Sequence, residues 1–375
     1  MTSRIPAEVF PPGEFVRDEL EARGWTQAVL AEVMGRPERV ISEVISGKRA
    51  ITPETARGLS AAFGTDATFW INLEGAYRLS RARHSDEDVR RRSVIYSYAP
   101  IKEMARRGWI EVTESVDVLE QRIRVFFEVP SLSEPPAFYG SAKATAVPAT
   151  SAQLAWMFRV KQIAREMVAP KYSEKSLRGS LDHLRALMTA PEESRHVPRL
   201  LTECGIRLAF VEPLVGSKID GVCFWLDDAS PVVGMSLRHD RIDNFWFVLR
   251  HEIEHVLRKH GRAIAVLDTE LEGDRAGTGP GVTQDERVAN EAAADFCVPK
   301  QQMDHFVSAK EPFFAERDIL GMARTLQVHP GIVAGQLQHR TKRYDRFRNH
   351  LVKIRSFVAP GAMVDGWGDV APVAD

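Results

Sequence analysis

Residues 245–257 most constrain how this chain can fold, because they combine the pattern His-Glu-x-x-His with an apolar run that lacks glycine and proline. Such a run predicts an α-helix. Since four residues make slightly more than one helical turn, His251 and His255 should project from one face of that helix. Two imidazoles placed in this way can bind a single tetrahedral Zn²⁺, so the segment predicts a zinc site.

Glu252 directly follows the first histidine, where its carboxylate can reach a metal-bound water rather than the metal itself. A cation lowers the pKa of such a water towards neutrality, and a nearby carboxylate can then remove the proton. Glu252 is therefore the predicted catalytic base of a zinc peptidase. The alternative is a surface helix with two histidines and two glutamates. The apolar neighbours argue against it, because they predict burial, and buried histidine and glutamate need partners.

A zinc site of this kind needs a third protein ligand and leaves its fourth position for water. The alanine-rich segment 285–299 ends in proline and predicts a second helix that supplies this ligand. Glu286 is followed four residues later by Asn290, and Glu291 by Asp295. Either pair could place one carboxylate on the metal and a second polar group one turn further along, where it orients a ligand. The spacing does not decide between the two glutamates.

The two segments together resemble the ImmA/IrrE family of zinc metallopeptidases, through His-Glu-x-x-His, then Glu-x-x-Ala-Asn-x-x-Ala-Ala and a later proline. The resemblance implies that Glu286 is the third ligand, with Asn290 in the Ala-Asn pair of the family motif. The chain departs from the family at Ala292, where Phe is usual, and at 296–297, where Leu-Leu is common. The resemblance also implies an endopeptidase that cuts a regulatory protein, such as a repressor or an antitoxin.

The first 85 residues predict a compact bundle of five helices, because short apolar runs alternate with helix-capping residues and glycines. Thr26 is expected to cap a helix over 27–34 that ends at Gly35, and a further helix is expected over 38–45. Two short helices joined by a glycine-containing turn predict a helix-turn-helix arrangement.

This bundle resembles the Cro/repressor-type helix-turn-helix domain in the version carried by HigA antitoxins, on the basis of residues 12–15, 25–31, 40–49, 51–56 and 69–73. The resemblance implies that residues 36–42 lie at or in the major groove of an operator, and that nearby side chains approach phosphates. A homodimer is expected. The candidate DNA contacts are Gln27, Arg36, Arg39, Ser42, Lys48 and Arg49.

The charge of this segment tempers the DNA-binding interpretation, because residues 1–85 hold equal numbers of basic and acidic side chains. Glu38 and Glu43 on the expected recognition helix would repel phosphate. A dimer with a few well-placed arginines could still bind a specific operator. The alternative is a bundle that serves for protein binding or dimerisation.

The rest of the chain predicts an α+β fold, mostly α with a small β-sheet. Residues 86–150 predict a helical spacer, irregular over 130–148, and 151–310 the metallopeptidase domain. Strands are expected over 205–211, 221–226 and 231–237, the last two joined as a hairpin. The edge of this three-stranded sheet could hold an extended peptide across the zinc.

Residues beyond the metallopeptidase domain predict two further helices over 319–337, in a helix-turn-helix-shaped pair that is expected to pack against the core. They form part of a C-terminal helical segment, 311–357. The small, proline-containing and acidic segment from Val358 onwards is expected to be disordered.

Arg238 and His239 follow the third expected strand and could stabilise a tetrahedral oxyanion, although a structural role in the loop is an equal alternative. His260 lies five residues after His255, off the expected ligand face, and is predicted to be a surface residue. The glycine-rich part of 261–284 predicts a mobile loop at the mouth of the cleft.

Composition sets the remaining limits. A chain of 375 residues predicts two or three domains, and a net charge of −1 gives no general attraction to nucleic acid or membranes. Three well-separated cysteines and the absence of a signal-like or membrane-spanning run predict a cytoplasmic protein with no membrane partner.

The sequence therefore predicts a DNA-binding transcriptional regulator with a zinc-dependent endopeptidase domain. Its partners would be operator DNA and a protein substrate or cognate toxin. The first alternative is a HigA-type antitoxin and autorepressor in which the zinc domain is a non-catalytic sensor or scaffold. The second is a peptidase whose helical N-terminus only recruits substrate. The substrate, the operator and any activating signal stay open.

Overall fold

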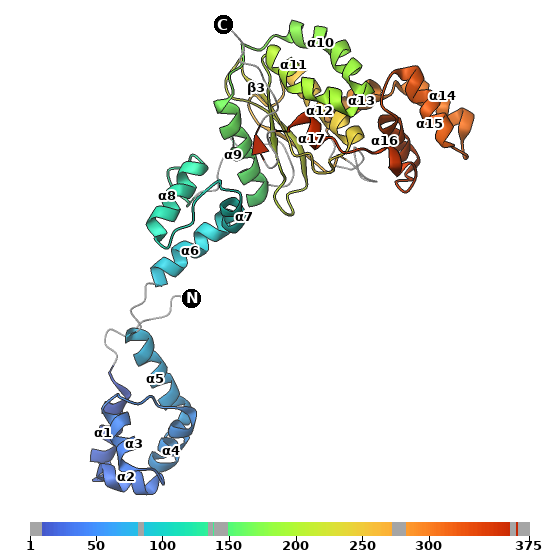
Figure 1. Ribbon diagram of the computed structural model, residues 1–375. Helices are drawn as coiled ribbons and strands as arrows, with labels where there is room; N and C mark the ends of the chain where they lie inside the picture. The colour runs from blue at the N-terminus through green and yellow to red at the C-terminus, as the bar shows by residue number, and fades with distance from the viewer. Residues whose placement is uncertain are drawn as a thin grey trace. The chain divides into compact units, whose positions relative to one another are not determined.

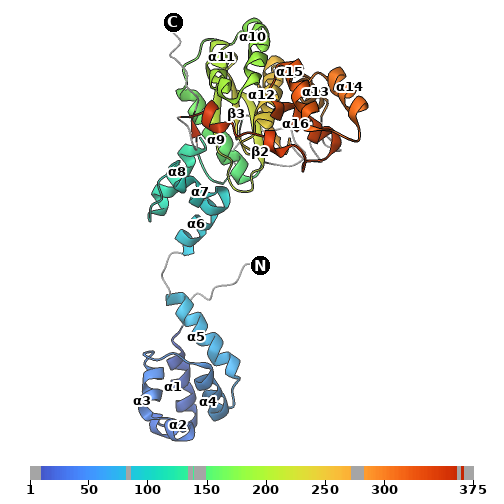
Figure 2. The same ribbon diagram turned by 45° about the vertical axis from the view of Figure 1, so that its right-hand side comes forward.

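The computed structural model describes residues 10–81, 86–133, 138, 149–271, 283–360 and 365–366. The chain divides between Val89 and Arg90 into two compact units, each drawn in Figures 1 and 2. No helix within the described ranges is long and apolar enough to cross a bilayer. The fold is mostly helical with one small sheet, which confirms the predicted α+β class.

The N-terminal unit is the predicted bundle, with helices α1 (Pro12–Arg23), α2 (Gln27–Val33), α3 (Glu38–Ile45), α4 (Pro53–Phe63) and α5 (Ala67–Arg81). Local sequence fixes the helix ends. The Thr26 hydroxyl accepts the Val29 amide at the start of α2, and Gly24 ends α1 in the left-handed conformation. The helices close over one apolar core around the fully buried Trp70.

The boundary between the units falls within α6 (Asp86–Tyr98). The second unit continues with α7 (Ile101–Arg106) and α8 (Val116–Phe126), followed by α9 (Ser151–Glu166). The sequence predicted the first three as a spacer. They are not separate from the rest of the second unit, because Ile95, Met104 and Leu119 share a core with Trp156 of α9 and with the sheet. Most of the connection expected over 130–148 lies outside the described residues.

The sheet has five strands in the order β4-β2-β3-β1-β5. The strands are β1 (Arg207–Val211), β2 (Ile219–Trp225), β3 (Pro231–Met235), β4 (Val266–Thr269) and β5 (Asp365–Gly366). β1 and β3 are parallel, and the other pairs are antiparallel, including the predicted β2–β3 neighbours. The expectation of three strands is therefore wrong. β4 and β5 are too short to show the alternation that identified the others.

Both faces of the sheet are covered. Leu208, Cys223 and Val233 belong to the core that contains α12 (Ile242–Leu257), whereas their neighbours, such as Ala209 and Val222, belong to the core that contains α9. This alternation follows the two-residue period of a strand. As a result β2 is buried along its whole length. His251 and His255 of α12 are buried in the interior of the unit.

Seven further helices complete the described part of the second unit. They are α10 (Glu174–Ala186), α11 (Val197–Glu203), α13 (Gln284–Cys297), α14 (Lys300–Lys310), α15 (Glu316–Leu326), α16 (Pro330–Thr341) and α17 (Arg355–Val358). Two of them, α13 and α16, pack directly against α12. α15 and α16 form the predicted pair, and Ile332 and Val333 of α16 are fully buried in the core shared with α12. The expected packing against the core is therefore confirmed.

The expectation of disorder from Val358 onwards is wrong for the described residues there. Val358 and Ala359 are fully buried, and Asp365 lies in β5, next to β1. The Asp365 carboxylate accepts hydrogen bonds from Trp109 Nε1 and Arg159 Nε, both at 2.7 Å. These contacts join Asp365 to residues more than 200 positions away, so the local composition from which disorder was expected could not reveal them.

Gly13 provides a test of the N-terminal packing. A Cβ at this position would collide with the backbone carbonyl of Ile45 at the end of α3. We therefore expect Gly13→Ala to destabilise the bundle by about 1–3 kcal/mol. Hydrogen exchange of the amides in residues 10–81, followed by mass spectrometry, measures this locally.

Gly75→Ala is the matched control, because Gly75 lies within α5 and has nothing within 4 Å of the added Cβ. Alanine there should stabilise the helix by about 0.5–1 kcal/mol. Equal effects of the two substitutions would show that α1 does not approach α3 as closely as described.

Candidate metal centre

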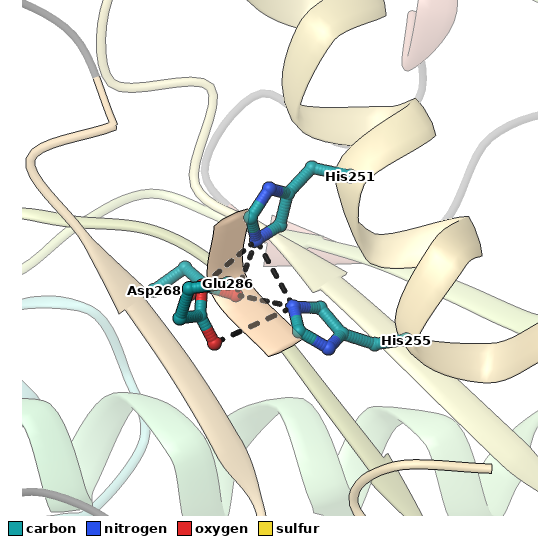
Figure 3. A group of neighbouring side chains, drawn as sticks. All are labelled: His251, His255, Asp268 and Glu286. Carbon is teal, nitrogen blue, oxygen red and sulfur yellow. Dashed lines mark hydrogen bonds and ion pairs between the residues drawn. The ribbon is translucent and has the colours of Figure 1, made fainter. Parts of the chain in front are cut away.

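Four side chains from three elements converge on one point inside the second unit (Figure 3). His251 and His255 extend from α12, Asp268 from β4 and Glu286 from the first turn of α13, and one ligand atom from each lies within 4.8 Å of the others. The helical spacing brings the two histidines together as predicted. Their Nε2 atoms are 3.0 Å apart.

The distances between these atoms are those of a metal-ligand set. His251 Nε2 is 3.4 Å from Asp268 Oδ2 and 3.3 Å from Glu286 Oε2. His255 Nε2 is 3.8 Å from Asp268 Oδ2 and 3.6 Å from Glu286 Oε1. Ligands about 2.1 Å from a tetrahedral ion lie about 3.4 Å from one another. The observed distances lie on both sides of this value, so one Zn²⁺-sized ion fits among the four.

Burial makes a cation the natural partner of this group. His251, Glu252 and His255 are fully buried, and Asp268 is 4% exposed. Burial raises the pKa of Glu252 and of Glu286, and the negative charge of Asp268 raises both further. Although burial opposes it, the carboxylates of Asp268 and Glu286 raise the pKa of His251 to about 9. Carboxylates this close together repel one another unless a positive charge lies between them.

Glu252 lies against β2, in space that only a glycine leaves free. A Cβ on Gly221 would collide with Glu252 Oε1, and neither carboxylate oxygen of Glu252 has a hydrogen-bond partner within the described residues. The same strand position pairs Gly221 with Asp268 across the sheet. Glu252 therefore lies beside the ligand group, where a general base is needed, and its catalytic role stays a prediction.

The choice between the two glutamates of α13 is clear in the geometry. Thr283 caps α13 by accepting the Glu286 amide, which places Glu286 in the first turn, facing α12. Glu291 is exposed and lies about 140° further around the helix, because five residues at 100° each exceed one turn by that angle. Asn290 is half-buried, one turn after Glu286. Its predicted role in orienting a ligand stays untested.

Asp268 is the residue that sequence reasoning missed, since no strand was expected within 261–284. The short run Val-Leu-Asp-Thr offered little evidence of a strand. An acidic residue in this short run, between the helix of His251 and the helix of Glu286, was the only signal in the sequence. The glycine-rich segment expected to be mobile lies within 272–282, outside the described residues.

His260 corrects a second expectation. Its Nδ1 lies 2.9 Å from His255 Nδ1, and its Nε2 lies 3.7 Å from Asp285 Oδ1, so it is not a free surface residue. α12 ends at Leu257, and the left-handed Lys259 turns the chain back towards His255. Helical spacing could not predict this contact. A hydrogen bond to the second ring nitrogen is the usual way to orient a histidine ligand.

Arg238 is engaged with a buried carboxylate. Its Nε and Nη2 donate to Asp220 at 3.0 and 3.1 Å, and Asp220 also accepts the Leu271 amide at 2.7 Å. This favours the structural alternative for Arg238, because the ion pair ties the loop after β3 to β2. Burial, and then Arg238, lower the pKa of the half-buried His239. Oxyanion stabilisation by Arg238 or His239 stays a prediction.

The candidate DNA contacts lie on and around α2 and α3 of the N-terminal unit. Arg39, Ser42, Lys48 and Arg49 are exposed, whereas Gln27 and Arg36 are half-buried. Glu43 accepts hydrogen bonds at 2.8 Å from both Arg39 and Arg49, and these lower its pKa. Arg36 pairs with Glu54. The arginines proposed to meet DNA are thus held by acidic neighbours.

Known proteins match the N-terminal unit. Residues 16–70 fit the helix-turn-helix family. Virulence-associated protein I of Dichelobacter nodosus is 34% identical over 21% of this chain and 73% of its own length. Antitoxin HigA-1 of Vibrio cholerae is 37% identical over 23% of this chain and 81% of its own length. The solved Pseudomonas aeruginosa antitoxin HigA with the higBA promoter is 32% identical over 20% of this chain and 83% of that chain, with a TM-score of 0.20.

The chain therefore belongs to the helix-turn-helix family through its N-terminal unit. Its similarity to HigA antitoxins, which the sequence predicted, is confirmed. These relatives correspond to about a fifth of the chain, as their coverage of 21% and 23% indicates. The resemblance of the second unit to a metallopeptidase family stays a prediction.

Metal content tests the ligand set. We expect the purified wild type to bind close to one zinc per chain, and Glu286→Ala to bind it at least about tenfold more weakly, because a direct ligand matters no less than the groups that orient it. Zinc affinity, measured by competition with a chromophoric chelator, gives the ratio.

Glu291→Ala is the matched control, since it removes an exposed carboxylate from the same helix. It should retain wild-type affinity. The opposite ranking of the two variants would show that α13 presents a different face to the histidines.

Proposed function

We propose that this protein is a DNA-binding transcriptional regulator whose second unit is a zinc-dependent endopeptidase. The observation that carries the enzymatic part is the convergence of His251, His255 and Glu286 beside the buried Glu252. The resemblance of these two helices to the ImmA/IrrE peptidases supports it. By that resemblance the substrate is a regulatory protein, such as a repressor or an antitoxin.

The chemistry follows from the side chains. His251, His255 and Glu286 would hold Zn²⁺, which when bound acidifies a water and polarises a carbonyl group. Glu252 would take the proton from the water that attacks the amide and return it to the departing amine. Because Gly221 leaves space beside its carboxylate, Glu252 can stay close to the ligands without binding the ion itself.

The DNA-binding part rests on the N-terminal unit. It has the paired short helices α2 and α3, and it is 37% identical to an antitoxin, HigA-1 of Vibrio cholerae. We propose that α3 enters the major groove of an operator and that Lys48 and Arg49, just after it, contact phosphates. Both side chains are exposed, as such contacts require.

One observation favours the alternative of an antitoxin with a non-catalytic zinc domain. Asp268 reaches the same two histidine nitrogens as Glu286, and four protein ligands are typical of structural zinc sites. The two functions differ in whether protein is cleaved, so a cleavage assay separates them.

Cleavage by the Glu252→Gln variant tests the endopeptidase. Loss of the general base should reduce the cleavage rate at least about a hundredfold while the zinc stays bound. The assay incubates zinc-loaded protein with the products of neighbouring genes and detects fragments by mass spectrometry.

Glu254→Gln is the matched control. Glu254 lies in the same motif but pairs with Arg250 and Arg258, at 2.9 and 2.7 Å. It should cleave as the wild type does. Equal fragment yields from Glu252→Gln and the wild type, both above the yield without added protein, would remove Glu252 from the mechanism.

Glu43 tests the DNA interface. Glu43→Gln should free Arg39 and Arg49 for phosphate, so binding to the upstream DNA of the gene should tighten. Its dependence on salt should become steeper by up to about two ions, because each added phosphate contact releases close to one counterion. Fluorescence anisotropy across a salt series measures both effects.

Glu38→Gln removes the same charge from α3 but leaves the ion pairs of Glu43 intact. Glu38→Gln should therefore change the salt dependence of DNA binding less than Glu43→Gln does. DNA affinity that is unaffected by Arg39→Ala and by Arg49→Ala would contradict the proposed interface.

A further inference from the structure

Asp268 is placed as a ligand in the same way as Glu286. Its Oδ2 atom lies 3.4 and 3.8 Å from the Nε2 atoms of His251 and His255, against 3.3 and 3.6 Å for the Glu286 oxygens. In Figure 3 both carboxylates face the two imidazole rings. Whatever ion the histidines hold, Asp268 can reach it as well as Glu286 can.

The backbone fixes Asp268 in this position. β4 pairs with β2 so that Asp268 lies opposite Gly221, with Leu267 opposite Val222. Beyond the strand, the buried Asp220 accepts the Leu271 amide at 2.7 Å, and the backbone amide of Glu270 donates to the Lys218 carbonyl at 3.3 Å. The direction of the Asp268 side chain is therefore set by the sheet, and residues of β2 and the turn before it also hold the two residues that follow β4.

The surroundings of Asp268 require a positive partner. The residue is 4% exposed, and within the described residues its Oδ2 atom makes no hydrogen bond of normal geometry, only the long contacts to His251 Nε2 at 3.4 Å and His255 Nε2 at 3.8 Å. A buried carboxylate oxygen without a donor is costly, and a metal ion removes that cost.

We propose that Asp268 is the fourth protein ligand of the metal ion in the resting protein and closes the position that water would otherwise take. This inference rests on the proposed function. With two imidazoles and two carboxylates the coordination sphere is complete, so the peptidase is latent. Water gains access only when the Asp268 carboxylate leaves the ion.

Cobalt substitution tests this closure without an activity assay. Co²⁺ in place of Zn²⁺ in the full chain should give a tetrahedral visible spectrum that azide does not change in the wild type. In Asp268→Ala the position opens, so azide should shift the spectrum, and Co²⁺ affinity should fall at least about tenfold. Asp268→Asn, which keeps the side-chain shape, is measured in parallel in case the alanine variant fails to fold.

Glu270→Gln is the control, because it removes a half-exposed carboxylate two residues away that is not among the four ligands. It should behave as the wild type does. A wild-type spectrum that azide shifts as strongly as that of Asp268→Ala overturns the closure but leaves the proposed function intact. A wild type that binds no metal overturns both.

A cleavage assay then distinguishes closure of the metal site by Asp268 from the proposed endopeptidase activity. If the wild type is closed to azide, the Asp268 variants are open to it, and the variants cut a partner protein faster than the wild type does, latency is established. If the variants are open to azide and cut nothing, Asp268 is still the fourth ligand, but the latent endopeptidase is overturned.

Discussion

The second unit depends on one constraint: several ionisable side chains share a site from which water is almost excluded. His251, Glu252 and His255 are fully buried, and Asp268 nearly so. Taking such groups out of water costs several kcal/mol each unless charges of the opposite sign compensate. The apolar length of α12 between the sheet and α16 makes the site dry, and the carboxylates from β4 and α13 supply negative charge around the imidazoles. A divalent cation would complete this balance, which explains why the fold brings together three elements that are separated in sequence.

What the sequence could predict depends on how local the determining interactions are. The pairing of His251 with His255 follows from helical geometry alone, and Thr26 marks the start of α2 through a bond to a residue three positions away. Glu286 followed from a family resemblance, and spacing could not choose it over Glu291. Asp268 and His260 were missed because their positions depend on the β4–β2 register and on a turn after α12. Neither feature leaves a periodic pattern in the residues themselves.

In the N-terminal unit the fold could be predicted from local sequence. Its DNA binding depends instead on which charged side chains pair with one another. Caps, glycines and apolar periodicity determine the five helices. Whether α3 meets DNA depends on Glu43, which holds Arg39 and Arg49 in ion pairs on the surface of the unit. Exposed ion pairs are weak, so the phosphates of a duplex can compete for both arginines. A bundle with balanced charge can therefore bind DNA through a small number of residues that exchange one anionic partner for another.

The charge of the proposed ligand set links the two functional alternatives for the second unit. Two neutral imidazoles and two carboxylates balance a divalent ion completely, whereas two imidazoles and Glu286 alone leave one positive charge. In a dry interior the balanced set is the more stable one, because an uncompensated charge is poorly solvated. The unbalanced set is the more reactive one, because the residual charge is what acidifies water and polarises a carbonyl. Stability and reactivity thus favour opposite positions of one side chain, Asp268. A zinc scaffold and a latent peptidase differ only in whether that side chain ever leaves the ion.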